Sequence, residues 1–410
     1  MDTTSRTEVQ RRVVAVLFVS QLVGGIGMGI GIAVGVLFAA RLVGQAGAGV
    51  AGMAMVVGSA VLAPPMASLM LARGRRLGLA AGYLVGAIGA ALLVGCAITG
   101  SVAVLYPAMF CFGAATTANF QARFAVVDLA APATRGRSLS TVVWATTVGA
   151  VSGPAIAAHA DTVAREAGWP AMAGPFAVAF LSFLVASAIV AVGLRPDPLL
   201  VARARGIGPD VVPTGRRATI RALRSIPAAR FGVLAMVAGH LVMVSLMSMT
   251  PVHLDHVGGE LGTVSAIMSA HLAGMFAASP VIGWASDRFG RRAVIAAGAA
   301  GLLAACVLAW AFDRDTTVLT VVLVLLGLSW SATLIGGSTL LTESLPAATR
   351  PTVQGLADLA MGLAGAAGSA VAGVLLGAAG YSALALACGG AVVALAAVGA
   401  AYQTGRSATG

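Results

Sequence analysis

The stretch that decides the fold runs from Val13 to Ala40 and reads VVAVLFVSQLVGGIGMGIGIAVGVLFAA. It contains no charged residue, and its 28 residues exceed the roughly 20 that a helix needs to cross the hydrocarbon core of a bilayer. The apolar segment of a signal peptide is much shorter, at about 7–15 residues. We therefore expect this stretch to remain in the protein as a transmembrane helix.

The composition of the whole chain supports the same interpretation. Of its 410 residues, 59% are hydrophobic and 10% are charged, and the mean hydropathy is +0.96. A soluble domain carries about 25% charged residues, so a soluble enzyme and a nucleic-acid-binding protein are both excluded. The four cysteines lie inside apolar runs without metal-site spacing, which is typical of buried small hydrophobic residues. The sequence predicts a polytopic membrane protein whose partner is the lipid bilayer.

Polar breaks divide the chain into twelve predicted spans, six on each side of a basic stretch at 195–230. We expect an N-terminal six-helix bundle at 1–194, a cytoplasmic linker at 195–230 and a C-terminal six-helix bundle at 231–410. The expected fold is all-α, with twelve transmembrane helices in two pseudo-symmetric bundles. The predicted spans lie near 13–40, 47–72, 77–100, 102–128, 138–160, 170–194, 231–253, 259–285, 293–311, 317–341, 352–378 and 381–402.

The net charge of +11 predicts the orientation of these spans in the membrane. All 25 basic residues are arginines, and 22 of them fall in the tails, linker and loops of one side. Positively charged loops stay in the cytoplasm, so we expect a multi-pass protein of the cytoplasmic (inner) membrane with both termini in the cytoplasm.

Two loops recur about 215 residues apart and support the division into halves. The stretch 128–135 reads DLAAPATR and 343–350 reads ESLPAATR, while 67–76 reads ASLMLARGRR and 283–292 reads GWASDRFGRR. Related halves with a pathway at their interface are typical of secondary transporters.

The loop at 283–292 resembles the signature loop of the major facilitator superfamily, and the resemblance extends over essentially the entire chain. Asp287 is expected to cap the connecting segment and to pair with an arginine, forming a gating latch on the inner side. A purely topological arginine cluster is the alternative. The N-terminal copy has Leu71 and Ala72 in place of the Asp-Arg pair, so an intact network is expected only in the C-terminal bundle. The matching residues are Gly283, Asp287, Arg288, Gly290, Arg291 and Arg292.

The fifth span carries Gly149, Gly153 and Pro154, which resemble a superfamily motif often associated with drug–proton antiporters. Small residues four apart permit close helix approach, and proline bends a helix. We interpret the motif as a helix-packing feature, which transporters of many substrates share.

Histidines and methionines gather in the seventh and eighth spans. Met236, His240, Met243 and Met247 fall within about 40° on one helix, and Met268, His271 and Met275 within about 60° on the next. Because the spans are antiparallel, Met243 and His271 are expected at similar depth, with Met247 further out and Met275 further in. Thioether and imidazole ligands favour Cu(I), and an imidazole in hydrocarbon is costly and usually functional. Ordinary apolar packing is the alternative for each methionine.

Met243-xxx-Met247 and His271-xxx-Met275 resemble the motifs of one superfamily subgroup, the CcoA-like copper importers. The resemblance implies that these four residues bind copper as a transported substrate for cytochrome oxidase assembly. Met236, His240 and Met268 are possible additional metal or proton sites. We expect a monomer without a bound cofactor, and a downstream copper chaperone is a possible partner. Two alternatives stay open: a proton-coupled efflux antiporter of drugs or small molecules, and a copper receptor that does not transport.

Overall fold

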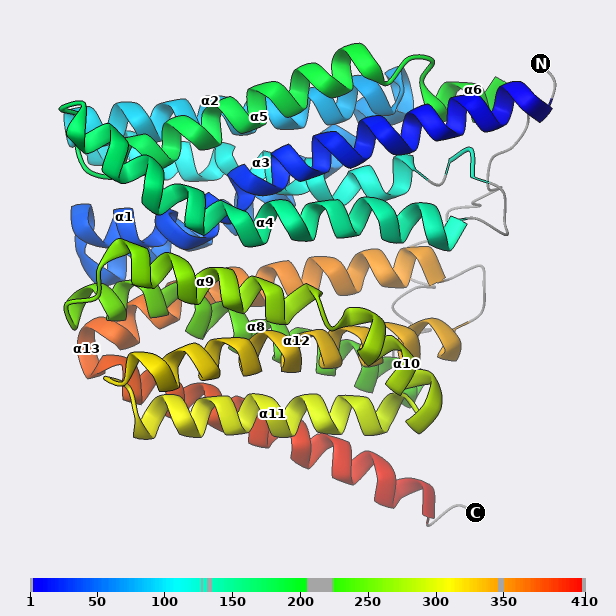
Figure 1. Cartoon of the computed structure of the whole chain (residues 1–410). Coiled ribbons are helices and arrows are strands. Elements are labelled where there is room, and N and C mark those ends of the chain that lie inside the picture. Colours follow the sequence, from blue (N-terminus) through cyan, green and yellow to red (C-terminus); the bar gives the residue numbers. More distant parts are fainter. Residues whose placement is uncertain are drawn as a thin grey trace. The chain divides into compact units, whose positions relative to one another are not determined.

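The computed structural model describes residues 3–126, 128–130, 135–204, 223, 225–345 and 350–407, and these are almost entirely helical. Figure 1 shows the helices as long rods joined by short turns. The elements are α1 (Thr3–Arg73), α2 (Arg75–Thr99), α3 (Val102–Ala125), α4 (Arg135–Glu166), α5 (Ala173–Gly193), α6 (Pro198–Ala204), α8 (Pro227–His256), α9 (Leu261–Phe276), α10 (Ser279–Phe289), α11 (Arg291–Ala311), α12 (Thr316–Ser344) and α13 (Arg350–Ser407).

Two of these helices are long enough for two spans each. α1 is interrupted at Gly44, with a φ of 76°, and α13 at Gly380, with a φ of 82°. A positive φ at these angles favours glycine, so each glycine fixes a turn between two spans. With α9 and α10 counted as one segment and α1 and α13 as two each, the described helices divide into twelve segments near the predicted spans. Among the described residues nine helices are long and apolar enough to cross a membrane, and the all-α membrane fold is confirmed.

The chain separates into two compact units. The first comprises Met1–Pro209 and Glu260–Ser269, and the second comprises Asp210–Gly259 and Ala270–Gly410. Large buried rings fill the first unit, where Phe38 packs edge-on against Phe176 and Phe112 against Phe183. In the second unit an apolar cluster joins α8, α12 and α13. Its buried members are Ala229, Met236, Leu341, Leu345, Val353, Ala357 and Met361.

The eighth span differs from its prediction as one continuous helix over 259–285. α9 ends at Phe276 and α10 begins at Ser279, with Pro280 in its first turn. Proline has no N–H to donate and its ring crowds the preceding turn, so it bends or interrupts a helix and is favoured in a first turn. The break at Ala277–Ala278 lies directly before the turn that holds Pro280, whereas α4 and α8 continue through Pro154 and Pro251.

Reciprocal glycines bring α1 and α4 into backbone contact. A Cβ on Gly149 would collide with the carbonyl oxygen of Leu22, and one on Gly153 would lie 2.5 Å from the carbonyl oxygen of Ile26. On the facing helix, a Cβ on Gly25 would lie 2.8 Å from the carbonyl oxygen of Thr146. Small residues allow this approach. A side chain at Gly149 or Gly153 would therefore not fit between the two helices.

We expect Gly149→Ala to destabilise the protein by about 1–3 kcal/mol, because the new methyl group forces two backbones apart. Gly95→Ala on α2 is the matched control, since a Cβ there would meet no atom within 4 Å. Thermal unfolding of the two purified variants in detergent measures the difference. Equal unfolding temperatures would contradict the close approach of α1 and α4.

Candidate functional site

His271 on α9 is buried and keeps one ring nitrogen unpaired. Its side chain is 0% exposed, and its Nδ1 lies 2.6 Å from the carbonyl oxygen of Leu323 on α12. A carbonyl oxygen only accepts, so Nδ1 donates the proton and the lone pair of the neutral ring stays on Nε2. Among the described residues Nε2 has no hydrogen-bond partner. Histidines that bind metals usually donate their other ring N–H in this way.

Gly327 on α12 allows the backbone of α9 to lie directly against that helix. A Cβ on Gly327 would lie 2.7 Å from the carbonyl oxygen of His271 and 2.8 Å from the amide nitrogen of Met275. Met275 is buried, with 7% of its surface exposed. The His271–Met275 turn is therefore held against the 323–327 segment of α12.

α8 also packs against α12, with the face that carries its methionines. A Cβ on Gly239 would collide with the Thr333 hydroxyl, and one on Gly337 would lie 2.7 Å from Cγ of Met236. At 100° per residue, Met243 and Met247 lie within about 40° of Met236, so they share the face turned to α12. Met243 is 2% exposed.

Trp330 on α12 gives a common reference height for the two helices. It donates a hydrogen bond to His240 on α8, and its ring lies edge-on to Phe276 at the end of α9. The glycine contacts lie in the same part of α12: Gly327 lies against His271 and Met275, and Gly239, four residues before Met243, lies against Thr333, six residues along α12 from Gly327.

The two helices also flank one side of α12. The α12 residues that contact α8 (Trp330, Thr333 and Gly337) and those that contact α9 (Leu323 and Gly327) are about 70° apart around the helix. The described contacts thus place α8 and α9 on one side of α12, with the His271–Met275 turn directly against it. Sequence reasoning missed α12, because its role depends on a backbone carbonyl and on glycines.

The three additional predicted residues have other surroundings. Nδ1 of His240 accepts the Trp330 indole N–H at 3.1 Å, so the lone pair of the neutral ring is engaged and Nε2 carries the proton. Met236 lies in the apolar cluster of the second unit, and Met268 is fully buried. Among the described residues no group of three His, Cys, Asp or Glu could hold a metal, so a metal site here would need thioether ligands.

The predicted gating loop of the C-terminal bundle contains a chain of ion pairs. Arg291 Nη2 lies 3.0 Å from Asp287 Oδ1 and 2.6 Å from Glu343 Oε1 at the end of α12. Gly290 joins α10 to α11 with a φ of 90°, which favours glycine. Asp287 pairs with Arg291 as expected, and the N-cap residue of α11 is Gly290, which makes no side-chain cap hydrogen bond. Gly283 has no atom within 4 Å of an ideal Cβ, and Arg288 is exposed.

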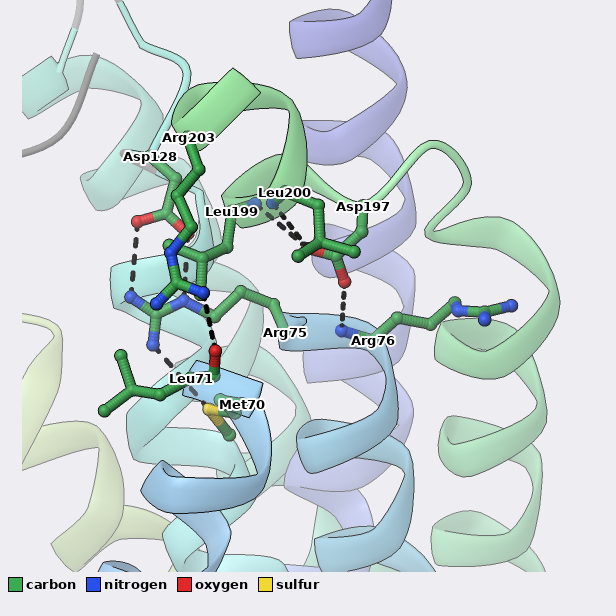
Figure 2. Close-up of polar contacts among 9 residues, drawn as sticks. All are labelled: Met70, Leu71, Arg75, Arg76, Asp128, Asp197, Leu199, Leu200 and Arg203. Atoms are coloured by element: carbon green, nitrogen blue, oxygen red, sulfur yellow. Dashed lines mark hydrogen bonds and ion pairs between the residues drawn. The ribbon is translucent and has the colours of Figure 1, made fainter. Parts of the chain in front are cut away.

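The N-terminal bundle has its own network, contrary to the expectation from Leu71 and Ala72. Figure 2 shows Arg75 reaching Asp128 with two hydrogen bonds, of 2.9 and 3.2 Å. This pair corresponds to Arg291 and Glu343 in the repeated loops. Its arginine and its carboxylate lie outside the missing Asp-Arg positions, which is why the network persists.

Residues after α5 complete this network. Asp197 accepts the backbone N–H of Arg76 and those of Leu199 and Leu200 (Figure 2). Arg203 on α6 donates to the carbonyl oxygen of Leu71 at 2.5 Å. The start of the predicted linker therefore docks on the loop between α1 and α2, which the spacing of the sequence did not indicate.

A second polar cluster is buried in the first unit. Gln21 donates to the carbonyl oxygen of Asn119 at 2.8 Å and to the Thr146 hydroxyl at 2.9 Å, and it accepts from the Tyr83 hydroxyl at 2.5 Å. These side chains satisfy one another inside the bundle, and they form a neutral site that contains no ionisable carboxylate.

The chain has two sets of six spans, and in each set an arginine–carboxylate pair joins the two repeated loops. This arrangement defines a membrane transporter of the secondary type. The comparisons with known proteins give the family. Residues 252–408 match the Major Facilitator Superfamily. The chain is 36% identical to the MFS-type transporter YdeG of Bacillus subtilis (strain 168), over 92% of this chain and 88% of that protein. The chain belongs to the Major Facilitator Superfamily, and it is a transporter and not an enzyme.

Other relatives are more distant. The riboflavin transporter RfnT of Brucella anthropi is 28% identical over 79% of this chain and 79% of its own. The crystal structure of a bacterial homologue of the human lysosomal transporter Spinster matches 98% of this chain and 97% of its own, with a TM-score of 0.71 at 16% identity. This structural likeness agrees with the fold.

We expect Arg75→Gln to raise the pKa of Asp128. Burial raises the pKa of the Asp128 carboxyl above its ordinary value, and the ion pair with Arg75 acts in the opposite direction. Removing the guanidinium leaves the burial effect unopposed, so the carboxyl takes up its proton at a higher pH. Infrared titration measures the shift, with Asp128→Asn identifying the band. A lower or unchanged pKa in Arg75→Gln would contradict the ion pair.

We also expect the two corresponding ion pairs to differ in strength. The side chains of Arg75 and Asp128 are 18% and 13% exposed, whereas Glu343 is 52% exposed. A double-mutant cycle with alanine should give a coupling of about 1–3 kcal/mol for Arg75 and Asp128, and a smaller one for Arg291 and Glu343. Thermal unfolding of the single and double variants measures both. The reverse order would be inconsistent with the burial of the first pair.

Proposed function

We propose that this transporter imports copper, as Cu(I), by alternating access, with Met243, Met247, His271 and Met275 as the ligands along its path. The observation that carries the proposal is the free Nε2 of His271. A buried imidazole with an engaged Nδ1 and an unpaired Nε2 has a lone pair available for a soft metal ion. Its burial also makes a purely structural histidine costly, since nothing described compensates Nε2.

The positions of the methionines support the proposal. On each helix the two ligands are four residues apart, about 6 Å along the axis, which is suitable for passing an ion from one ligand to the next. A thioether is a neutral ligand, so a Cu(I) ion is bound without burying a second charge, and it can be released again.

The loop networks supply the conformational part of the mechanism. Arg75 with Asp128 and Arg291 with Glu343 tie the loops of each unit to the end of a neighbouring helix. Alternating access requires each bundle to move as a unit while one side opens and the other closes. We infer that these pairs keep each loop attached to its bundle during that movement.

The wider role rests on the resemblance to the CcoA-like subgroup. On that basis the imported copper supplies cytochrome oxidase assembly, and a cytoplasmic copper chaperone receives it. The resident membrane is the cytoplasmic one, with both termini inside, because the arginines gather on one side.

Copper uptake in cells that express the chain tests the proposal. We expect His271→Gln and Met243→Leu each to lower the uptake of radiolabelled copper by more than about tenfold, because each removes a ligand and keeps the volume similar. Met249→Leu is the matched control, a buried methionine of α8 outside the predicted set. Equal uptake in all variants and in cells without the chain would reject copper as the substrate.

A neutral organic solute is the second candidate. It is favoured by the buried cluster of Gln21, Tyr83 and Asn119, and by the identity to a protein named as a riboflavin transporter. Radiolabelled riboflavin in the same cells separates the candidates. Uptake of riboflavin that depends on Gln21 and not on His271 would support the organic solute, and export of organic toxins would support the efflux alternative.

A further inference from the structure

A cavity of about 370 Å³ lies in the first unit, where α5 ends and α2 begins. It belongs to the end of the bundle that carries the basic loops, and the proposed copper path in the second unit does not use it. The inference drawn from it goes beyond the proposed function and does not depend on it. The cavity is lined by Arg76, Arg195, Pro196, Asp197 and Leu200.

Arginines converge on the end of α5 beside this cavity. Arg76 Nη1 donates to the carbonyl oxygen of Ala191 at 3.4 Å, and Arg12 Nε donates to that of Gly193 at 3.2 Å. Figure 2 shows the Arg76 side chain extending away from Arg75 and Asp128. Each of these bonds uses one N–H of a guanidinium that has five, so the others remain to bind an anion. Arg195 lies two residues after Gly193, and its side chain is exposed.

The one carboxylate that lines the cavity is engaged by the backbone. Asp197 Oδ2 accepts from the amide of Arg76 at 2.8 Å, and Oδ1 accepts from those of Leu199 at 3.0 Å and Leu200 at 3.2 Å. Its charge is stabilised by the first turns of α2 and α6. Two guanidinium groups against this one capped carboxylate leave the cavity net positive.

Exposed apolar side chains lead to the cavity along both helices. On α2 these are Leu77, Leu84 and Ile88, which lie within about 40° of one another, and Leu77 directly follows Arg76. On α5 they are Leu181, Val185 and Val192, again within about 40°, and Val192 lies three residues before Arg195. In a membrane protein such stripes contact acyl chains, so a ligand at the cavity would have lipid beside it.

We propose that this cavity binds the phosphate headgroup of an anionic phospholipid. Arg76 and Arg195 donate to the phosphate, Arg12 adds positive charge at the rim, and the acyl chains lie along the apolar stripes of α2 and α5. Arginine suits the phosphate because its fork of N–H groups matches two of the oxygens. The stripes select a lipid over a soluble phosphate, since only a lipid buries them. The bound headgroup joins the end of α5 to the start of α2.

Native mass spectrometry of the purified full chain tests this site. The protein is titrated with phosphatidylglycerol and, in parallel, with phosphatidylcholine of the same acyl chains. We expect the wild type to prefer phosphatidylglycerol, and Arg76→Gln with Arg195→Gln to weaken its binding roughly 25-fold, because each basic residue near anionic lipid contributes roughly fivefold. Arg165→Gln, which removes one charge from a 65% exposed side chain of α4, is the matched control for Arg195→Gln alone.

Three results would overturn the proposal. They are equal binding of the two lipids by the wild type, equal weakening in Arg165→Gln and in the double variant, and full displacement of phosphatidylglycerol by millimolar inorganic phosphate. The last would show that the cavity takes a free anion. Arg195→Gln alone keeps the test decisive if the double variant unfolds, since its side chain is exposed, and it should weaken binding roughly fivefold.

Discussion

The close approach of helix backbones at glycine is the constraint on which the described packing depends. Within a membrane no difference in hydrophobicity drives one apolar helix onto another, so association relies on tight contact. In the first unit Gly149 and Gly153 let α4 rest on carbonyl groups of α1. In the second unit Gly337 lets α12 approach the carbonyl oxygen of Gly232 on α8, Gly327 lets it approach that of His271 on α9, and Gly239 leaves room for the Thr333 side chain. A chain with 53 glycines uses many of them as places where a side chain cannot fit.

The constraint at Gly327 also determines the chemistry available at His271. Because α12 lies so close, the carbonyl oxygen of Leu323 comes within reach of Nδ1 and fixes the tautomer of the ring. Trp330 lies less than two turns further along α12, and its indole N–H donates to Nδ1 of His240. In that ring the proton is therefore on Nε2, the reverse of His271. Two histidines of one unit thus present different nitrogens to their surroundings, although in sequence both are histidines on apolar helices near methionines.

Much of the fold could be predicted from the sequence, because the lengths of apolar runs, arginine placement and repeated loops are local patterns. The lengths of the apolar runs place the turns at Gly44 and Gly380 between predicted spans. The break before Pro280 could not be predicted, since the prolines of other apolar runs, such as Pro154 and Pro251, leave their helices continuous. The site was predictable only as a set of residue types. Its partners on α12 are a carbonyl oxygen and a glycine, which carry no periodic signal, and the Asp128 network was hidden by the substitutions at Leu71 and Ala72.

The double capping role of Asp197 has a mechanical consequence. One carboxylate fastens the first turn of α6 to the first turn of α2, and Arg203 adds a second attachment at Leu71. The first ten residues of the basic stretch, from Arg195 to Ala204, are therefore carried by the first unit. A reporter group attached at Arg203 would follow the movement of that unit.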